Sequence, residues 1–222
     1  MKNSKILLVV VVMLVGCGKK EKIELAKNYY QLGMLELENA HSLPESYHQA
    51  LIYIDRALAV QPMAEYYATK AMILYNLGHA QESTAFFKKA LAYSPTGKLR
   101  AEITNNFACV LAHLKHDNQA LALWQQLIAD EHYVTPEVAW FNQSKVFVSR
   151  KEFDRAQQCL HKAIEIAPQY VDARYYLAIL AFSKHENEQA VLQLDTILAL
   201  APEHAGARSL REIVSARPEE TT

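Results

Sequence analysis

The chain has 222 residues, of which 51% are hydrophobic and 21% are charged, and its formal net charge is −1. With only six glycines, this composition can bury a core and favours an ordered helical protein over a disordered one. The near-neutral charge suggests no clustered basic surface, so we expect no nucleic-acid partner.

The N-terminus has the pattern of an export signal. Lys2 and Lys5 precede an apolar run at residues 6–15, which ends at Gly16-Cys17. Ten apolar residues are too few to cross a bilayer, which needs about 20. A basic start, an apolar middle and small residues at the end are typical of a cleaved signal peptide. We therefore expect residues 1–16 to be removed, which takes away two lysines and changes the net charge from −1 to −3.

The stretch Leu14-Val15-Gly16-Cys17 resembles a bacterial lipobox. In proteins with this motif the cysteine sulfur carries a diacylglycerol, and the new amino end is acylated. Each buried CH₂ contributes about 0.8 kcal/mol, so several acyl chains anchor a protein firmly. The resemblance implies lipid on Cys17, a lipidated tether at residues 17–22 and, because Gly18 rather than Asp follows, the periplasmic face of the outer membrane. The alternative is an ordinary signal peptide, or a short amphipathic anchor, with a chance cysteine.

Prolines then recur at a nearly constant interval, with Pro62, Pro95, Pro136, Pro168 and Pro202 spaced by 33, 41, 32 and 34 residues. Similar stretches precede four of them: ALIYIDRALAVQP, STAFFKKALAYSP, AQQCLHKAIEIAP and AVLQLDTILALAP. Each has a small residue, a large apolar residue four later and a small or aliphatic residue three after that, all on one helical stripe. Proline ends each helix because it has no N–H. A period near 34 with two helices per unit predicts an all-α helical solenoid.

These units resemble tetratricopeptide repeats, in which small residues let the two helices of a repeat approach. The resemblance is closest over residues 64–95, 136–168 and 171–202. The first repeat has a widened turn, and the third lacks the usual proline and continues into a longer connection. The resemblance implies about five repeats within residues 23–216, a capping helix at 205–216 and a polar tail at 217–222.

Motifs of catalysis and metal binding are missing from the sequence. It contains no Gly-rich phosphate loop, no HExxH and no GxSxG, so we expect neither an enzyme nor a cofactor. His113 and His116 have a spacing that two metal ligands could use, but they fall at a turn and no cluster joins them, so no metal is expected. Cys109 and Cys159 could pair in an oxidising space. Their spacing does not decide this, and we expect two separate buried thiols.

In a helical solenoid the first helix of each repeat lines an inner groove. Mapped by resemblance, the groove positions are Tyr30, Met34, Leu37, Met72, Tyr75, Phe141, Val148, Tyr175, Ile179 and Phe182. Aromatic rings and thioethers predict a protein partner that offers an apolar helix or extended segment. Repeat proteins that grip chaperone C-termini need Lys and Asn at Tyr30 and Met34, which excludes that partner class. The alternative is that these side chains only pack against neighbouring helices.

The lipobox, Tyr30-Gln31-Leu32-Gly33, Asn105-Asn106-Phe107 and Asn142 together resemble the PilF/PilW group. These are tetratricopeptide lipoproteins that act as pilotins in type IV pilus biogenesis. The chain departs from the group at Ala108 and Ser144, where glycine is usual. The resemblance implies an adaptor that promotes outer-membrane localisation and multimerisation of the pilus secretin, without a small-molecule substrate. Alternatives are a general envelope scaffold, for example an adaptor for peptidoglycan enzymes, a metal-dependent enzyme, or a cytoplasmic co-chaperone.

Overall fold

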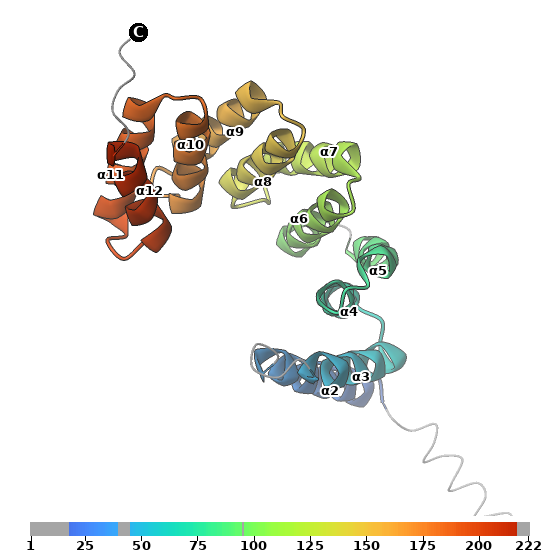
Figure 1. Ribbon diagram of the computed structural model, residues 1–222. Coiled ribbons are helices and arrows are strands. Elements are labelled where there is room, and N and C mark those ends of the chain that lie inside the picture. The colour runs from blue at the N-terminus through green and yellow to red at the C-terminus, as the bar shows by residue number, and fades with distance from the viewer. Residues whose placement is uncertain (1–17, 40–44, 95, 217–222) are drawn as a thin grey trace, which may run out of the picture. The chain divides into compact units, whose positions relative to one another are not determined.

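The computed structural model describes residues 18–39, 45–94 and 96–216, and within these ranges it contains eleven helices and no strand (Figure 1). The all-α fold class predicted from the proline spacing is therefore confirmed. The expected signal peptide at residues 1–16, the expected lipid attachment at Cys17, Pro95 and the expected tail at 217–222 lie outside the described residues. None of the described helices is long and apolar enough to cross a membrane.

The chain forms two compact units, and the first ends at Val110. Its helices are α2 (Lys19–Asn39), α3 (Ser46–Val60), α4 (Ala64–Asn76), α5 (Ala80–Tyr93) and most of α6 (Lys98–His113). The pairs α2/α3 and α4/α5 make the most extensive helix–helix contacts of this unit. Because α2 begins at Lys19, residues 19–22 form its first turn, although the sequence placed them in the tether.

The second unit begins at Leu111. Its helices after the end of α6 are α7 (Asp117–Ile128), α8 (Pro136–Ser149), α9 (Phe153–Ile166), α10 (Val171–Ser183), α11 (Asn187–Leu200) and α12 (Ala205–Ala216). The pairs α8/α9 and α10/α11 contact each other most, and α12 packs on α11. The helix expected at 205–216 thus covers α11, as a capping helix does.

The helical stripe read from the sequence is the core of both units. Its small and large apolar positions are all fully buried: Ala50, Ile54, Ala57, Ser83, Phe87, Ala90, Ala156, Leu160, Ala163, Ala190, Leu194 and Ile197. Pro62, Pro168 and Pro202 each follow the last residue of a helix by two positions, as predicted. Pro136 is instead the first residue of α8, where its missing N–H leaves no bond unmade.

Four of the turns between paired helices lie within the described residues, and these four share one backbone conformation. Each contains a residue with positive φ, namely Gly78 (86°), Lys115 (63°), Lys151 (60°) and His185 (64°). The residue that follows donates its N–H to the carbonyl five positions back, as Glu152 does to Phe147 at 2.8 Å and Glu186 does to Ala181 at 2.9 Å. This is the Schellman motif, which satisfies carbonyls at a helix end. His79, His113, His116 and His185 lie at these turns or at the adjoining helix ends, as predicted.

The two cysteines within the described residues, Cys109 and Cys159, differ in environment. Cys159 on α9 is buried and carries a free thiol, so it does not pair with Cys109. Cys109 on α6 is partly exposed. The two cysteines form no disulfide with each other, as expected, but only Cys159 is buried, whereas both were expected to be.

Candidate functional site

One face of α2 carries the predicted binding residues of the first unit. Tyr30, Met34 and Leu37 share this face because they are separated by four and three residues. Leu37 packs against the buried cluster of Ala50 with Ile54 and Ile73, whereas 37% of Met34 stays exposed. Ile23, seven residues before Tyr30, lies on the same face and is 41% exposed. The sequence mapping omitted Ile23, although its spacing from Tyr30 is itself a helical repeat.

Tyr30 joins α2 to α4. Its ring stacks on Tyr66 with the centroids 4.6 Å apart. Its hydroxyl donates to Glu65 Oε1 at 3.1 Å and lies 3.2 Å from Thr69 Oγ1. Burial raises the pKa of Tyr30 to about 12, and the Glu65 carboxylate contributes in the same direction. Tyr30 therefore holds two helices together, and less of its ring is left for a partner than the sequence implied.

Met72 and Tyr75, the other predicted positions of this unit, are half-buried on α4. The five predicted residues of the first unit therefore lie on α2 and α4, and Tyr30 brings these two helices into contact. Within this set the exposed hydrophobic atoms belong mainly to Met34, and Ile23 extends the surface along α2.

In the second unit, Phe141 is a core residue. It is 8% exposed and belongs to the cluster formed by α8, α9 and α10. Its ring packs edge-on against Tyr170 and Tyr176, at centroid distances of 5.3 and 5.1 Å. Lys145 Nζ lies 4.8 Å from the Phe141 ring centroid. These contacts leave Phe141 little surface to offer a partner.

Three further predicted positions pack between helices. Val148 packs against the cluster that contains Phe141, while Tyr175 and Phe182 pack against the cluster of α10, α11 and α12. The Tyr175 ring lies 5.0 Å from the ring of His204, so this side chain faces the capping segment.

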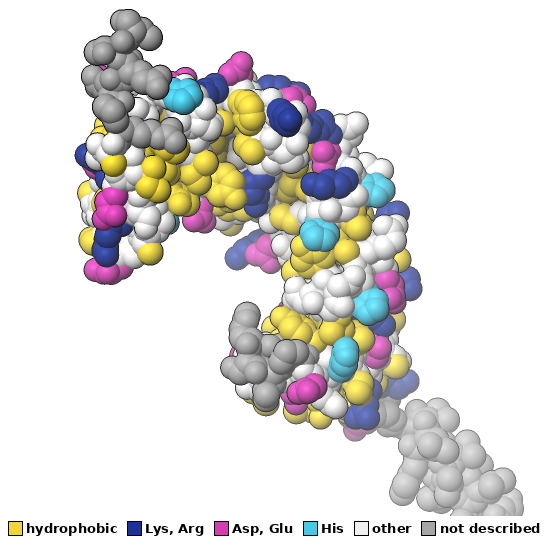
Figure 2. Space-filling view, viewed as in Figure 1, with side chains coloured by type: hydrophobic (Ala, Val, Ile, Leu, Met, Phe, Trp, Pro, Cys, Tyr) yellow, Lys and Arg dark blue, Asp and Glu magenta, His cyan; other side chains and the backbone are white. Residues whose placement is uncertain are grey.

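The exposed apolar surface of α10 is formed by Ile179, which was predicted, and Tyr176, which was not. They are 42% and 37% exposed and three residues apart, so they share a helix face. Figure 2 shows hydrophobic side chains gathered over the helices of this unit. Within the described residues, no group of three or more His, Cys, Asp and Glu side chains could hold a metal ion.

Comparison with known proteins identifies the repeat. Tetratricopeptide-repeat models match residues 64–96 and 147–213. Proteins built from this repeat are typically scaffolds that bind other proteins and are not enzymes. No curated protein matches the sequence.

Solved structures share the fold across most of the chain. PilF of Pseudomonas aeruginosa is 19% identical, with a TM-score of 0.72 over 87% of this chain and 84% of that chain. PilW, described as a widely conserved type IV pilus biogenesis factor, is 21% identical, with a TM-score of 0.65 over 86% and 93%. MamA of Desulfovibrio magneticus RS-1 is 17% identical, with a TM-score of 0.64 over 83% and 98%. The chain is a tetratricopeptide-repeat helical solenoid, as predicted.

Proposed function

We propose that this protein is a lipid-anchored pilotin, which promotes outer-membrane localisation and multimerisation of a type IV pilus secretin. The observation that carries the proposal is the likeness to PilF and PilW over more than four-fifths of each chain. The lipobox-like end at Cys17 supports the same assignment, because it supplies the anchor that a pilotin needs.

The proposed mechanism is physical and involves no chemical step. Lipid on Cys17 holds the protein at the periplasmic face of the outer membrane. Bound there, it raises the concentration of its partner at the membrane without any new contact. Apolar side chains such as Met34 on α2 cover an apolar segment of the secretin subunit until neighbouring subunits of the ring replace them.

Deletion of the gene in the native bacterium tests the proposal. Envelope fractions are examined for secretin multimers that resist detergent. We expect multimers to disappear from the outer membrane, to return with the intact gene, and to stay absent when the gene carries Cys17→Ser. Normal multimers in the deletion strain would exclude a pilotin.

A general envelope scaffold is the second candidate, because proteins built from tetratricopeptide repeats are typically scaffolds that bind other proteins. Such a scaffold would share the anchor and the repeats. The same deletion strain distinguishes the two candidates. If the protein is a scaffold for peptidoglycan enzymes, its loss leaves secretin multimers intact and changes the sensitivity of the cell wall to lysis.

A further inference from the structure

We propose that a pocket between α7, α8 and α9 binds an acidic, apolar peptide segment of a partner protein. A large apolar side chain enters the pocket, a backbone carbonyl beside it accepts a hydrogen bond from Gln143, and a neighbouring acidic side chain pairs with basic residues at the rim. The site lies within the second unit and does not depend on the pilotin assignment.

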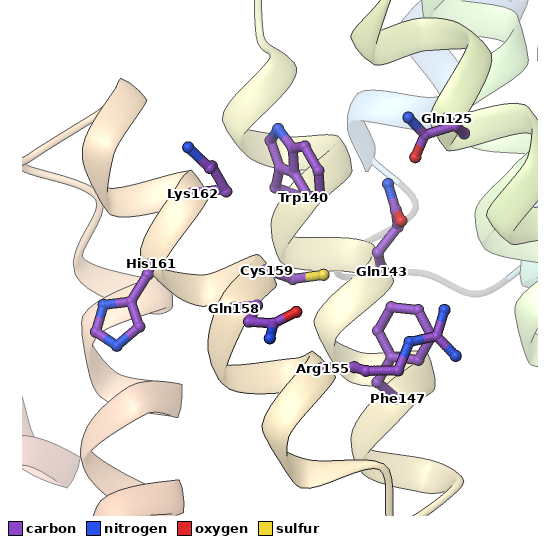
Figure 3. Close-up of a pocket in the computed structure, with 9 residues that line it drawn as sticks. All are labelled: Gln125, Trp140, Gln143, Phe147, Arg155, Gln158, Cys159, His161 and Lys162. Carbon is purple, nitrogen blue, oxygen red and sulfur yellow. The ribbon is translucent and has the colours of Figure 1, made fainter.

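The pocket has a volume of about 510 Å³. Trp140, Gln143 and Phe147 follow one another by three and four residues, so they form one face of α8. Gln125 comes from α7, and Cys159 with its neighbours comes from α9 (Figure 3). The cavity is large enough for one or two side chains, and Trp140 and Phe147 give it an aromatic wall on α8.

Gln143 is the feature that indicates a ligand. It is 5% exposed, and its Nε2 group is buried without a hydrogen-bond partner among the described residues. A buried amide that makes no hydrogen bond destabilises a protein, and native structures contain few of them. Figure 3 shows the Gln143 carboxamide extending from α8 toward the α7 side of the pocket. A carbonyl oxygen of a bound peptide would satisfy it.

The charge of the rim selects the partner. No acidic residue lines the pocket, whereas Arg155 and Lys162 do. The Arg155 guanidinium lies 4.1 Å from the Phe147 ring centroid and also pairs with Glu152, and Lys162 pairs with Glu165. Both pairs are exposed, and such pairs contribute little. A carboxylate of a partner can therefore take the place of Glu152 beside Arg155 or of Glu165 beside Lys162.

The floor of the pocket is uncharged. Cys159 is buried there, and burial raises the pKa of its thiol to about 11, so the thiol stays protonated at neutral pH. A neutral thiol beside Trp140 and Phe147 suits an apolar side chain. A polypeptide supplies the apolar side chain, the carbonyl and the carboxylate in adjacent positions.

Two fluorescein-labelled peptides with the cores Glu-Leu-Phe-Glu and Lys-Leu-Phe-Lys test the site by fluorescence anisotropy with the purified full-length protein. We expect the acidic peptide to bind about tenfold more tightly. Gln143→Leu should weaken that binding by about fivefold and raise the melting temperature of the unliganded protein, because it removes the unpaired amide. Arg155→Glu combined with Lys162→Glu should reverse the preference between the peptides.

Lys145→Glu is the matched control, since it reverses a charge on the other side of α8 and should leave peptide binding unchanged. Equal affinity for both peptides, unchanged binding by the Gln143→Leu protein, or a lower melting temperature for that variant would overturn the proposal. Saturable binding of decanoate without binding of either peptide would assign the pocket to a fatty acid and would also overturn it.

Discussion

Gly33 of α2 lies tightly against α3. A Cβ at this position would stand 2.8 Å from Ile54 Cδ1 and 3.4 Å from the carbonyl oxygen of Ala50. Ile54 is fully buried, so its side chain has little room to move. The glycine of the Tyr30-Gln31-Leu32-Gly33 segment therefore has a packing reason, which does not depend on any partner.

Gly33→Ala and Ile54→Val should be coupled. Ile→Val in a core costs about 0.5–1.5 kcal/mol. In the Gly33→Ala protein the same change removes the atom that the new Cβ meets, so we expect it to cost about 1 kcal/mol less. Urea denaturation of the wild type, both single variants and the double variant measures this coupling. Additive free energies would show that the helices adjust freely at this contact.

The buried hydroxyl of Tyr30 makes stability depend on alkaline pH. An unfolded tyrosine ionises near pH 10, whereas burial raises the pKa of Tyr30 to about 12 in the fold. Between these values the unfolded chain releases a proton that the folded protein retains, so the free energy of unfolding decreases as pH rises. Below pH 10 this contribution is fully present.

Tyr30→Phe should reduce the loss of stability between pH 10 and about 12. At pH 7 the variant should be less stable by about 0.5–1.5 kcal/mol, because it lacks the hydrogen bonds to Glu65 and Thr69. Denaturation curves at pH 7, 9 and 11 give both effects. Parallel pH profiles for wild type and Tyr30→Phe would contradict the account.

At the scale of elements, the helix-pair turns show what a spacing pattern cannot predict. Gly78 suggests a left-handed residue, and the structure places one there. Lys115, Lys151 and His185 adopt the same conformation, although side chains of this kind seldom do. Their conformation follows from the Schellman hydrogen bonds that close each turn, such as the bond from Glu152 to Phe147. The local sequence does not predict it.

Lys151→Gly should stabilise the protein by about 1 kcal/mol. Glycine adopts the positive φ of this turn without the steric cost that a Cβ brings, and that gain exceeds its entropic cost. Lys151→Ala removes the same charge and keeps the Cβ, so it should give no such gain. Thermal unfolding of both variants separates the two effects. Equal melting temperatures would show that the turn carries no strain at Lys151.

Across the whole molecule, residue spacing predicted the fold better than the site. Small and large residues such as Ser83 and Phe87 recur on one helical stripe and are all buried, so the core could be read directly. The exposure of the residues predicted to line the groove could be read only in part. The resemblance to tetratricopeptide repeats placed Phe141 in the inner groove, but it could not show that Tyr170 and Tyr176 cover it.

The pocket around Gln143 was missed for a related reason. Gln143 interrupts the apolar face of Trp140 and Phe147, a signal that the sequence does contain. A glutamine within such a face is usually exposed or hydrogen-bonded. Its burial depends on helices α7 and α9 closing over α8, which only the tertiary structure reveals.

Two neighbouring residues of α2 allow a matched test of the proposed binding face. Met34 is 37% exposed on the side of Tyr30, and Leu35 is 55% exposed about 100° around the helix. Both can be replaced by Glu without burying a charge. Because Tyr30 holds α2 to α4, Tyr30→Ala would disturb packing, and Met34→Glu alone is the cleaner variant.

The most direct measurement is the amount of detergent-resistant secretin multimer in the outer membrane of the native bacterium that expresses Met34→Glu or Leu35→Glu. We predict that Met34→Glu lowers the multimer about tenfold, because a charge disrupts an apolar contact. Leu35→Glu should leave it at the wild-type level, with both variants equally abundant and folded by circular dichroism. Equal multimer levels in the two strains would contradict the claim that this face of α2 binds the secretin.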